Sequence, residues 1–429
     1  MKMVHLFKSL CLYCAGMVSL SALHAQNTIE SCYEAAMSYA PTARQYQLVE
    51  RAKGYNLENA ARGWWPQIQF EAKAQVQSDV TELPFDLGKL GFSGLETPRL
   101  KKDQYAASLS LQQPLYEGGQ VKAQKKAVWA SADVEARQTD VALYALREQV
   151  NQLFFGILLT KEQLHINDLL RDNLKLNLQR AESMRRAGLA HDADVDVIRV
   201  EQLNARQDSV NYRATLRAYT SMLAQLTGMR LDESSDFVKP ALSISQRTNG
   251  DRRPEMALYA ARLQQLNMSR QQLDASLRPS LSFFAQAGYG RPGLNMLKDD
   301  FSLYGVAGLR LTWNISRLYT RKHDIALLDN QRERIRTDQD AFLYNQRIDE
   351  AERSASLTRY DELVRHDDEI IRLRENIRRA SEARFAGGTL TATDLMRDVN
   401  DEQQARLARA LHEMQRLLEA YNLRFTRGE

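Results

Sequence analysis

The chain has 429 residues, with 58 Lys and Arg against 54 Asp and Glu and a formal net charge of +4. Its mean hydropathy of −0.49 excludes a bundle of membrane-spanning helices, and 20 Gly and 9 Pro are too few for a collagen-like or disordered chain. Three Cys cannot staple a small secreted fold, and the nearly balanced charge argues against a dedicated nucleic-acid-binding protein.

Residues 1–25 have the pattern of a secretory signal peptide. Two Lys precede an apolar run over 10–23, and no acidic residue occurs before Glu30. We expect cleavage after Ala25. The alternative is a membrane anchor, although the run is shorter than the ~20 residues that a spanning helix needs. Cleavage leaves Cys32 as the one Cys of the mature chain, which cannot form an intrachain disulfide; whether Cys32 is modified stays open.

The two halves of the chain repeat in the same order. Residues 60–70 and 273–283 are both helical stretches that Pro interrupts and alternating residues follow, and 187–195 matches 387–395 with Gly and Asp at equivalent positions. This order indicates a tandem duplication of one large unit. The predicted division is a first structural repeat over 26–228, a connector over 229–253 and a second structural repeat over 254–429.

Each repeat contains two segments in which apolar and polar residues alternate. They lie at about 67–77 and 105–113 in the first repeat, and at 280–290 and 303–314 in the second. Period two is the signature of a strand with two different faces. Each segment is about ten residues long, the length of a tilted strand that crosses a membrane.

Long helices are predicted after each pair of strands. Segments 118–187 and 316–385 contain no Pro and place apolar residues at helical spacing. A continuous helix of about 70 residues is roughly 105 Å long and needs lateral partners in a coiled-coil-like bundle. Shorter helices over 191–228 and 391–426 can fold back along them. Each repeat therefore has the order helix, strand, strand, long helix, helix.

Four strands from one chain cannot close a barrel, and an open sheet edge is not viable in lipid, so copies of the chain must share one barrel. In this context the chain resembles the TolC-type outer-membrane efflux proteins. The junction 113–119 (QPLYEGG) resembles that family's strand-to-helix motif, and 188–195 and 388–395 resemble its two tip motifs. The second junction, 313–317, departs from the pattern because it lacks the Gly pair. The resemblance extends over nearly all of the mature chain.

The resemblance implies a mainly α protein with membrane β-structure. It implies a homotrimer whose twelve-stranded β-barrel in the outer membrane continues into a long periplasmic α-helical barrel. Such a trimer is the exit duct of a tripartite efflux or type I-like secretion system, contacts outer-membrane lipid, and docks to a periplasmic adaptor and through it to an inner-membrane transporter. No cofactor, metal or nucleic acid is implied.

Other functions remain to be compared with the channel. An enzyme is not expected, because the residues show no nucleophile–base pair, phosphate loop or metal-ligand spacing. The main alternative is a periplasmic coiled-coil adaptor or scaffold with a small β domain. A coiled-coil adhesin is a further alternative, but it favours an uninterrupted heptad run rather than strands bounded by Pro.

The first group of candidate site residues lies at the predicted tips of the helices. The resemblance implies that Gly188, Leu189, Gly387 and Gly388 contact the adaptor. Gly188 and Gly388 are also expected to supply positive-φ turns between antiparallel helices.

The second group is charged or aromatic. The resemblance makes Asp192, Asp194, Asp394 and Arg397 candidates for an entrance constriction. Helix capping is the simpler interpretation of Asp194 and Asp394, and Thr391 with Asp394 fits a capping box. Trp65 and Trp313 suit the aromatic belt at the edge of a membrane barrel, with ordinary core packing as the alternative.

Overall fold

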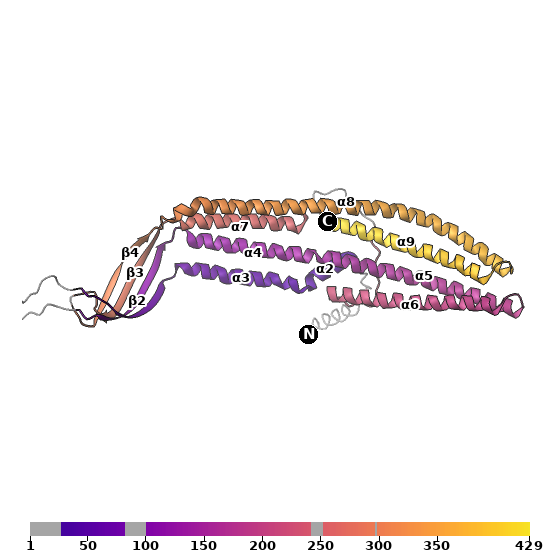
Figure 1. Cartoon of the computed structure of the whole chain (residues 1–429), viewed down its shortest axis with the longest axis horizontal. Coiled ribbons are helices and arrows are strands. Elements are labelled where there is room, and N and C mark those ends of the chain that lie inside the picture. Colours follow the sequence, from indigo (N-terminus) through magenta and orange to yellow (C-terminus); the bar gives the residue numbers. More distant parts are fainter. Residues whose placement is uncertain (1–26, 82–99, 242–251, 297) are drawn as a thin grey trace, which may run out of the picture. The chain divides into compact units, whose positions relative to one another are not determined.

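The computed structural model describes residues 27–81, 100–241, 252–296 and 298–429 (Figure 1). The predicted signal peptide, residues 82–99 between the first two predicted strands, and residues 242–251 of the connector lie outside the described residues. In chain order the elements are α2 (Ile29–Tyr39), η1 (Pro41–Arg44), α3 (Gln45–Ala61), η2 (Arg62–Trp64), β1 (Gln67–Val76), β2 (Asp103–Tyr116), α4 (Gln120–Tyr144), α5 (Leu146–Arg186), α6 (Asp192–Thr227), α7 (Pro254–Ser276), β3 (Ser280–Arg291), β4 (Ser302–Thr312), α8 (Arg317–Ala386) and α9 (Ala392–Arg427). The predicted fold class, mainly helical with a small antiparallel sheet, is confirmed.

One expected helix is interrupted. The segment 118–187 forms α4 and α5 with a break at Ala145, whereas the equivalent segment of the second half is the single 70-residue helix α8. Neither Pro nor Gly marks the break in the sequence, and Ala145 keeps right-handed helical angles. The break lies beside a tertiary contact, since the Tyr144 ring stacks on Phe425 at 4.8 Å and its hydroxyl donates to the Phe425 carbonyl at 2.8 Å.

The chain forms two compact units, each built from both halves of the sequence. The helical unit comprises Met1–Arg44, Thr139–Met256 and Ala341–Glu429, and the sheet unit comprises Gln45–Gln138 and Ala257–Asp340. Helix α8 runs through both units. The compact units therefore do not coincide with the two repeats of the sequence. Among the described residues, no helix is long and apolar enough to cross a membrane.

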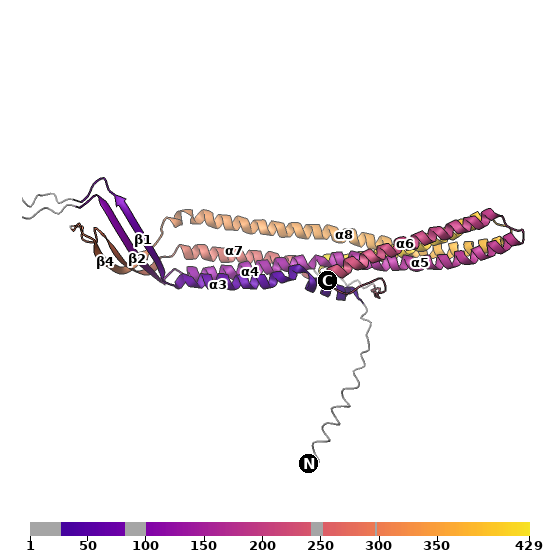
Figure 2. The same cartoon turned by 90° about the horizontal axis from the view of Figure 1, so that it is seen from below.

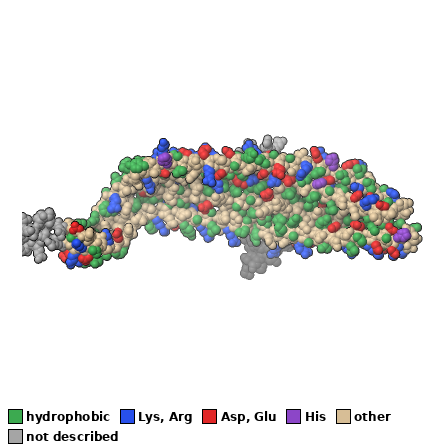
Figure 3. All heavy atoms as spheres, in the orientation of Figure 1, with side chains coloured by type: hydrophobic (Ala, Val, Ile, Leu, Met, Phe, Trp, Pro, Cys, Tyr) green, Lys and Arg blue, Asp and Glu red, His purple; other side chains and the backbone are tan. Residues whose placement is uncertain are grey.

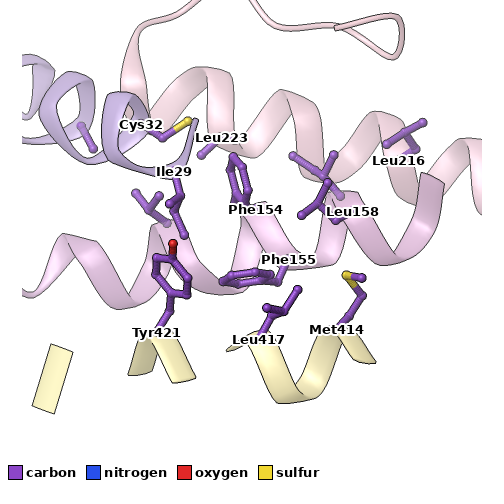
Figure 4. Close-up of a cluster of buried hydrophobic side chains, with 13 residues drawn as sticks. Ile29, Cys32, Phe154, Phe155, Leu158, Leu216, Leu223, Met414, Leu417 and Tyr421 are labelled. Atoms are coloured by element: carbon purple, nitrogen blue, oxygen red, sulfur yellow. The ribbon is translucent and has the colours of Figure 1, made fainter. Parts of the chain in front are cut away.

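The helical unit has an apolar core where α2, α5, α6 and α9 meet (Figure 4). Phe154 and Phe155 of α5 are 0% and 2% exposed. The Phe155 ring lies 5.4 Å from that of Tyr421 on α9, and Ile29 of α2 and Leu223 of α6 complete the cluster. Burying each large side chain contributes about 2–3 kcal/mol, so this cluster fixes the four helices against one another.

Cys32 belongs to the same core. Its side chain is 0% exposed, and burial raises the pKa of its thiol to about 11. The folded chain therefore keeps this thiol protonated and away from solvent at neutral pH.

A second cluster lies nearer to the turns that join α5 to α6 and α8 to α9. It combines Leu174 and Ala181 of α5, Ile198 of α6, and Leu395 of α9, each fully buried, with Phe385 at the end of α8. Helix α9 thus packs against α5 through apolar side chains along much of its length.

Helix α8 is joined to α9 mainly by charged side chains. The antiparallel pairs are Arg427–Glu350, Arg353–Glu419, Arg416–Asp361, His412–Asp367, Arg409–Asp368, Arg374–Asp401 and Arg378–Glu402. Only five residues of α8 are buried, and one of them, Asp367, accepts from His412 at 2.7 Å. In the described chain, the apolar clusters shared by α8 and α9 are limited to Leu357 with Ala420 and Leu423 and to Phe385 near the turn, so this pair of helices relies more on ion pairs than α5 and α9 do.

Candidate functional site

The sheet unit contains a four-stranded antiparallel sheet in the order β1-β2-β3-β4. Figure 2 shows β1 beside β2. Phe70 pairs with Leu109, Leu109 with Ala287, and Ala287 with Gly305. Because directly paired residues point to the same face of a sheet, this register joins the apolar residues of all four strands into one surface. The polar residues, such as Gln69, form the other.

The apolar face is exposed to an unusual degree. The large side chains on it are Ile68, Phe70, Leu109, Leu303, Leu309 and Leu311, which are between 51% and 81% exposed. Contiguous apolar surfaces of this kind mark a membrane or protein contact. The helices carry a mixed surface instead, with acidic and basic side chains interspersed among apolar ones on the face shown in Figure 3.

The polar face has two aromatic exceptions, each accommodated by a glycine. Tyr304 pairs with Gly288 and Phe284 with Gly308. A Cβ at Gly288 would lie 2.4 Å from the Tyr304 ring, and one at Gly308 would lie 3.1 Å from the Phe284 ring. These rings can therefore lie over the sheet, which explains aromatic residues in otherwise polar positions.

The sheet has two open edges. In the described residues, β1 pairs with β2 alone and β4 pairs with β3 alone. The outer backbone groups of both edge strands therefore lack a strand partner within this part of the chain, which is the arrangement that promotes pairing with another chain.

The two candidate Trp residues lie beside the strand ends with exposed rings. Trp65 is 62% exposed and directly precedes Pro66 and β1; Trp313 is 53% exposed and follows β4. Trp313 Nε1 donates to the Leu277 carbonyl at 3.0 Å. Neither ring is buried in a core of the described chain, so ordinary core packing does not account for them.

Both tips are built on left-handed glycines. Gly188 has φ +73° and Gly388 has φ +71°. After each of them the chain bonds back to the helix: Leu189 N donates to Met184 O at 2.9 Å, and Thr389 N donates to Arg384 O at 3.0 Å. This is the Schellman pattern, which needs a positive φ at the residue after the helix. Leu189 is 70% exposed at the turn.

Asp194 belongs to the cap of α6, and Asp394 lies in the first turn of α9, which Thr391 caps. The Asp194 carboxylate accepts from His191 N at 3.0 Å, and its other oxygen lies 3.4 Å from Ala392 N at the start of α9. The backbone N of Asp394 donates to Thr391 Oγ1 at 3.1 Å. Asp194 thus also joins the two tips. Its contact with Ala392 links residues 198 positions apart, and the sequence did not predict it.

The acids at the tips have basic partners within the same chain. Arg397 lies 3.3 Å from Asp394. Arg185 binds Asp192 at 2.9 Å, and this hydrogen bond raises the pKa of the guanidinium. Pairing partly compensates the negative charge of the candidate constriction residues, and both pairs are exposed, so salt screens them.

A buried polar network was also missed from the sequence. Tyr33 Oη donates to Asn151, and Asn151 Nδ2 donates to Asn422 Oδ1 at 2.9 Å. The network links α2, α5 and α9 inside the apolar core, where an unpaired amide would be costly. No spacing signal in the sequence identifies such a contact between distant residues.

The sequence and fold match known proteins. Residues 33–229 match the family described as outer membrane efflux protein. Among solved structures, the outer membrane protein VceC from Vibrio cholerae has 13% identity and a TM-score of 0.65, over 93% of this chain and 96% of that chain. The outer membrane channel CmeC from Campylobacter jejuni has 12% identity and a TM-score of 0.64, over 93% and 85%.

A third structure extends the likeness. The outer membrane channel MtrE from Neisseria gonorrhoeae, in its open state, has 15% identity and a TM-score of 0.64, over 93% of this chain and 88% of that chain. A search of curated proteins finds no match. The structural likenesses show the fold, and together with the family match they confirm the resemblance predicted from the strand junction and tip motifs.

Proposed function

We propose that copies of this chain form an exit duct through the outer membrane, on the basis of the match of residues 33–229 to the outer membrane efflux protein family. The protein is a passive conduit that spans from the outer membrane into the periplasm. The family match and the structural likenesses favour this channel over the alternative of a periplasmic coiled-coil adaptor.

The two-faced sheet carries the proposal. One face is a continuous exposed surface of Ile, Phe and Leu, and the other is lined by Gln, Ser, Glu and Lys. Such a sheet is suited to lipid on one side and water on the other. An adaptor in the aqueous periplasm gains nothing from exposing this many large apolar side chains.

The open edges determine that the duct needs several copies. Lipid offers no hydrogen bonds to the unpaired edges of β1 and β4, so β4 of one copy must pair with β1 of the next. Three copies give a barrel of twelve strands. In this pairing between copies, odd-numbered residues of β4 must lie opposite even-numbered residues of β1. A register shifted by one residue would place Ile68 and Phe70 of β1 on the opposite face of the sheet from Leu309 of β4.

The helical tips are the proposed docking site. Gly188, Leu189, Gly387 and Gly388 are assigned to contact with a periplasmic adaptor, which connects the duct to an inner-membrane transporter. The exposure of Leu189 at a rigid turn supports this role. Asp192, Asp194, Asp394 and Arg397 are assigned to the entrance, and Trp65 and Trp313 to the interfacial belt.

Fractionation and conductance test the proposal. We expect the protein in the outer-membrane fraction, and discrete conductance steps after the purified protein is added to a planar bilayer. Recovery in the soluble periplasm without conductance would instead fit an adaptor. Export profiling of a deletion strain, with drugs and secreted proteins measured together, then identifies the cargo.

A further inference from the structure

The polar face of the sheet is not uniform. On β1 and β2 this face is mainly Gln, Ser, Glu and Lys, and its amides bond to one another, as in the hydrogen bond of 2.8 Å from Gln75 Nε2 to Gln104 Oε1. Strands β3 and β4 lie side by side (Figure 1) and place Phe284, Val306 and Tyr304 on the same face. The large aromatic and aliphatic side chains of the polar face therefore belong to one pair of strands.

These side chains follow one another along β4. The Phe284 ring reaches across from β3, so that a Cβ at Gly308 would lie 3.1 Å from it. Val306 and Tyr304 are the next two positions of β4 on this face, and Arg310 is the next position in the other direction. Neighbouring positions on one face of a strand are about 7 Å apart. We call the row of Arg310, Phe284, Val306 and Tyr304 the lane.

Arg310 ends the lane with a positive charge. Its guanidinium carbon lies 4.7 Å from the centroid of the Phe284 ring, which is the geometry of a cation–π contact. Within the part of the chain that the structure describes, no acid forms an ion pair with Arg310. The guanidinium is therefore held in place by the ring, and its charge is available to a ligand.

The polar face as a whole also favours anions. In the described strands, the charged residues on this face are Glu71 and Lys73 of β1 and Arg310 of β4. Two cations against one anion leave a net positive charge on the face of each copy. At physiological ionic strength the Debye length is about 8 Å, so these wall charges attract an anion that passes close to the sheet and repel a cation.

We propose that the lane is a transient binding site for aromatic anions, that is, for small planar molecules that carry a carboxylate or sulfonate group. The anionic group pairs with Arg310, and the ring of the molecule stacks on Phe284 and then contacts Val306 and Tyr304. The proposal rests on the proposed function, in which the polar face lines the water-filled passage. It adds the chemical class of one cargo that the duct conducts.

The direction of the lane fits export. Arg310 lies near the end of β4 from which the chain continues into α8, and Tyr304 lies near the other end of the strand. In the proposed duct the helices lie in the periplasm, so a molecule on its way out meets the cationic end of the lane first. The six residues from Arg310 to Tyr304 span roughly 20 Å.

Packing over glycine accounts for only part of the lane. An aromatic ring on a strand can cover a glycine of the neighbouring strand, which explains the half-buried Phe284 and Tyr304. It does not explain Val306, which is 38% exposed on a face that meets water, or the exposed Arg310. An aromatic ring beside an aliphatic side chain and an accessible guanidinium is the combination that an aromatic anion requires.

Protection of an introduced cysteine tests the lane in the purified full-length protein in detergent micelles. The test variant is Val306→Cys. The matched control is Ser110→Cys, because Ser110 pairs with Gln286 and Gln286 pairs with Val306, so that both positions lie at the same level of the polar face. Native Cys32 is buried and common to both variants. The rate of labelling by a charged methanethiosulfonate is measured with and without millimolar naphthalenesulfonate.

We expect naphthalenesulfonate to slow the labelling of Val306→Cys by roughly threefold or more and to leave Ser110→Cys unchanged. Cyclohexanesulfonate, which has the charge without the aromatic ring, should protect less, and a naphthyl ammonium compound should not protect. Adding Arg310→Gln or Phe284→Ala to the test variant should remove the protection. Equal protection of both cysteines, or protection that persists with Arg310→Gln, would overturn the proposal.

Light scattering of the same samples separates this proposal from the proposed function. A monomer refutes the multi-copy duct. A trimer in which naphthalenesulfonate does not protect Val306→Cys refutes the lane alone.

Discussion

Replacing Leu109 with Arg tests which face of the sheet meets lipid. Leu109 lies in the central strand β2, paired with Phe70 and Ala287, and its side chain is 51% exposed. It lies six residues from Asp103 and seven from Tyr116. At about 3.4 Å per residue these are roughly 20 and 24 Å, so Leu109 lies near the middle of the strand.

The size of the effect depends on depth in the bilayer. A cationic side chain on the lipid face costs about 2–4 kcal/mol near the midplane and about 0–1 kcal/mol near the interfaces. Since 1.4 kcal/mol is a tenfold change, Leu109→Arg should lower the equilibrium constant for folding into lipid by roughly 30-fold to 700-fold. The adjacent Ser110 pairs with Gln69 and Gln286 on the polar face, so Ser110→Arg should cost far less.

Urea titration of the purified variants in lipid vesicles measures this difference. Folded fraction is followed by gel mobility without heating, and the amount of each variant in the outer-membrane fraction provides a cellular control. Equal destabilisation by both substitutions, or a harmless Leu109→Arg, would refute the assignment of the apolar face to lipid.

Four further predictions concern the helical unit. Cys32 should not react with a thiol reagent at pH 8 until the protein unfolds; because its pKa is raised to about 11, unfolding free energy should fall as pH rises from about 9 toward 11, and a pH-independent stability there would contradict this. Gly188→Ala should cost about 1–2 kcal/mol in chemical denaturation because φ is +73°, whereas Gly387→Ala, at a glycine without positive φ, should cost less. Arg378→Ala leaves the buried Glu402 with Arg406 as its remaining partner and should cost about 1–3 kcal/mol in thermal unfolding, whereas removing an exposed Arg such as Arg372 should change little. Arg397→Ala frees Asp394 and should raise single-channel cation selectivity at low salt; unchanged conductance, selectivity and export would exclude an entrance role for this pair.

Local pattern was enough to predict most of the elements. Alternation of apolar and polar residues predicted all four strands, because a strand between two different environments has a period of two. The turns at Gly188 and Gly388 were equally readable, since a left-handed residue after a helix is most often glycine. The family resemblance followed from the order of these local signals rather than from any one of them.

The break at Ala145 shows where local reasoning fails. Nothing within the segment 118–187 distinguishes this residue, and the interruption coincides with contacts that Tyr144 makes to Phe425, about 280 residues away. A helix-period pattern describes one helix and its faces, and it does not identify the neighbour that fills each face. The Asn151–Asn422 pair and the contact of Asp194 with Ala392 were unpredictable for the same reason.

The sequence by itself determined the period, length and polarity of each element, because these follow from the residues of a single segment. Only the tertiary structure decided that α9 packs on α5 through apolar side chains while ion pairs make up most of its contact with α8. It also decided that the strands join in a register that gathers their apolar side chains on one face. Those choices depend on contacts between distant segments, whose energies are compared only when the whole chain is packed.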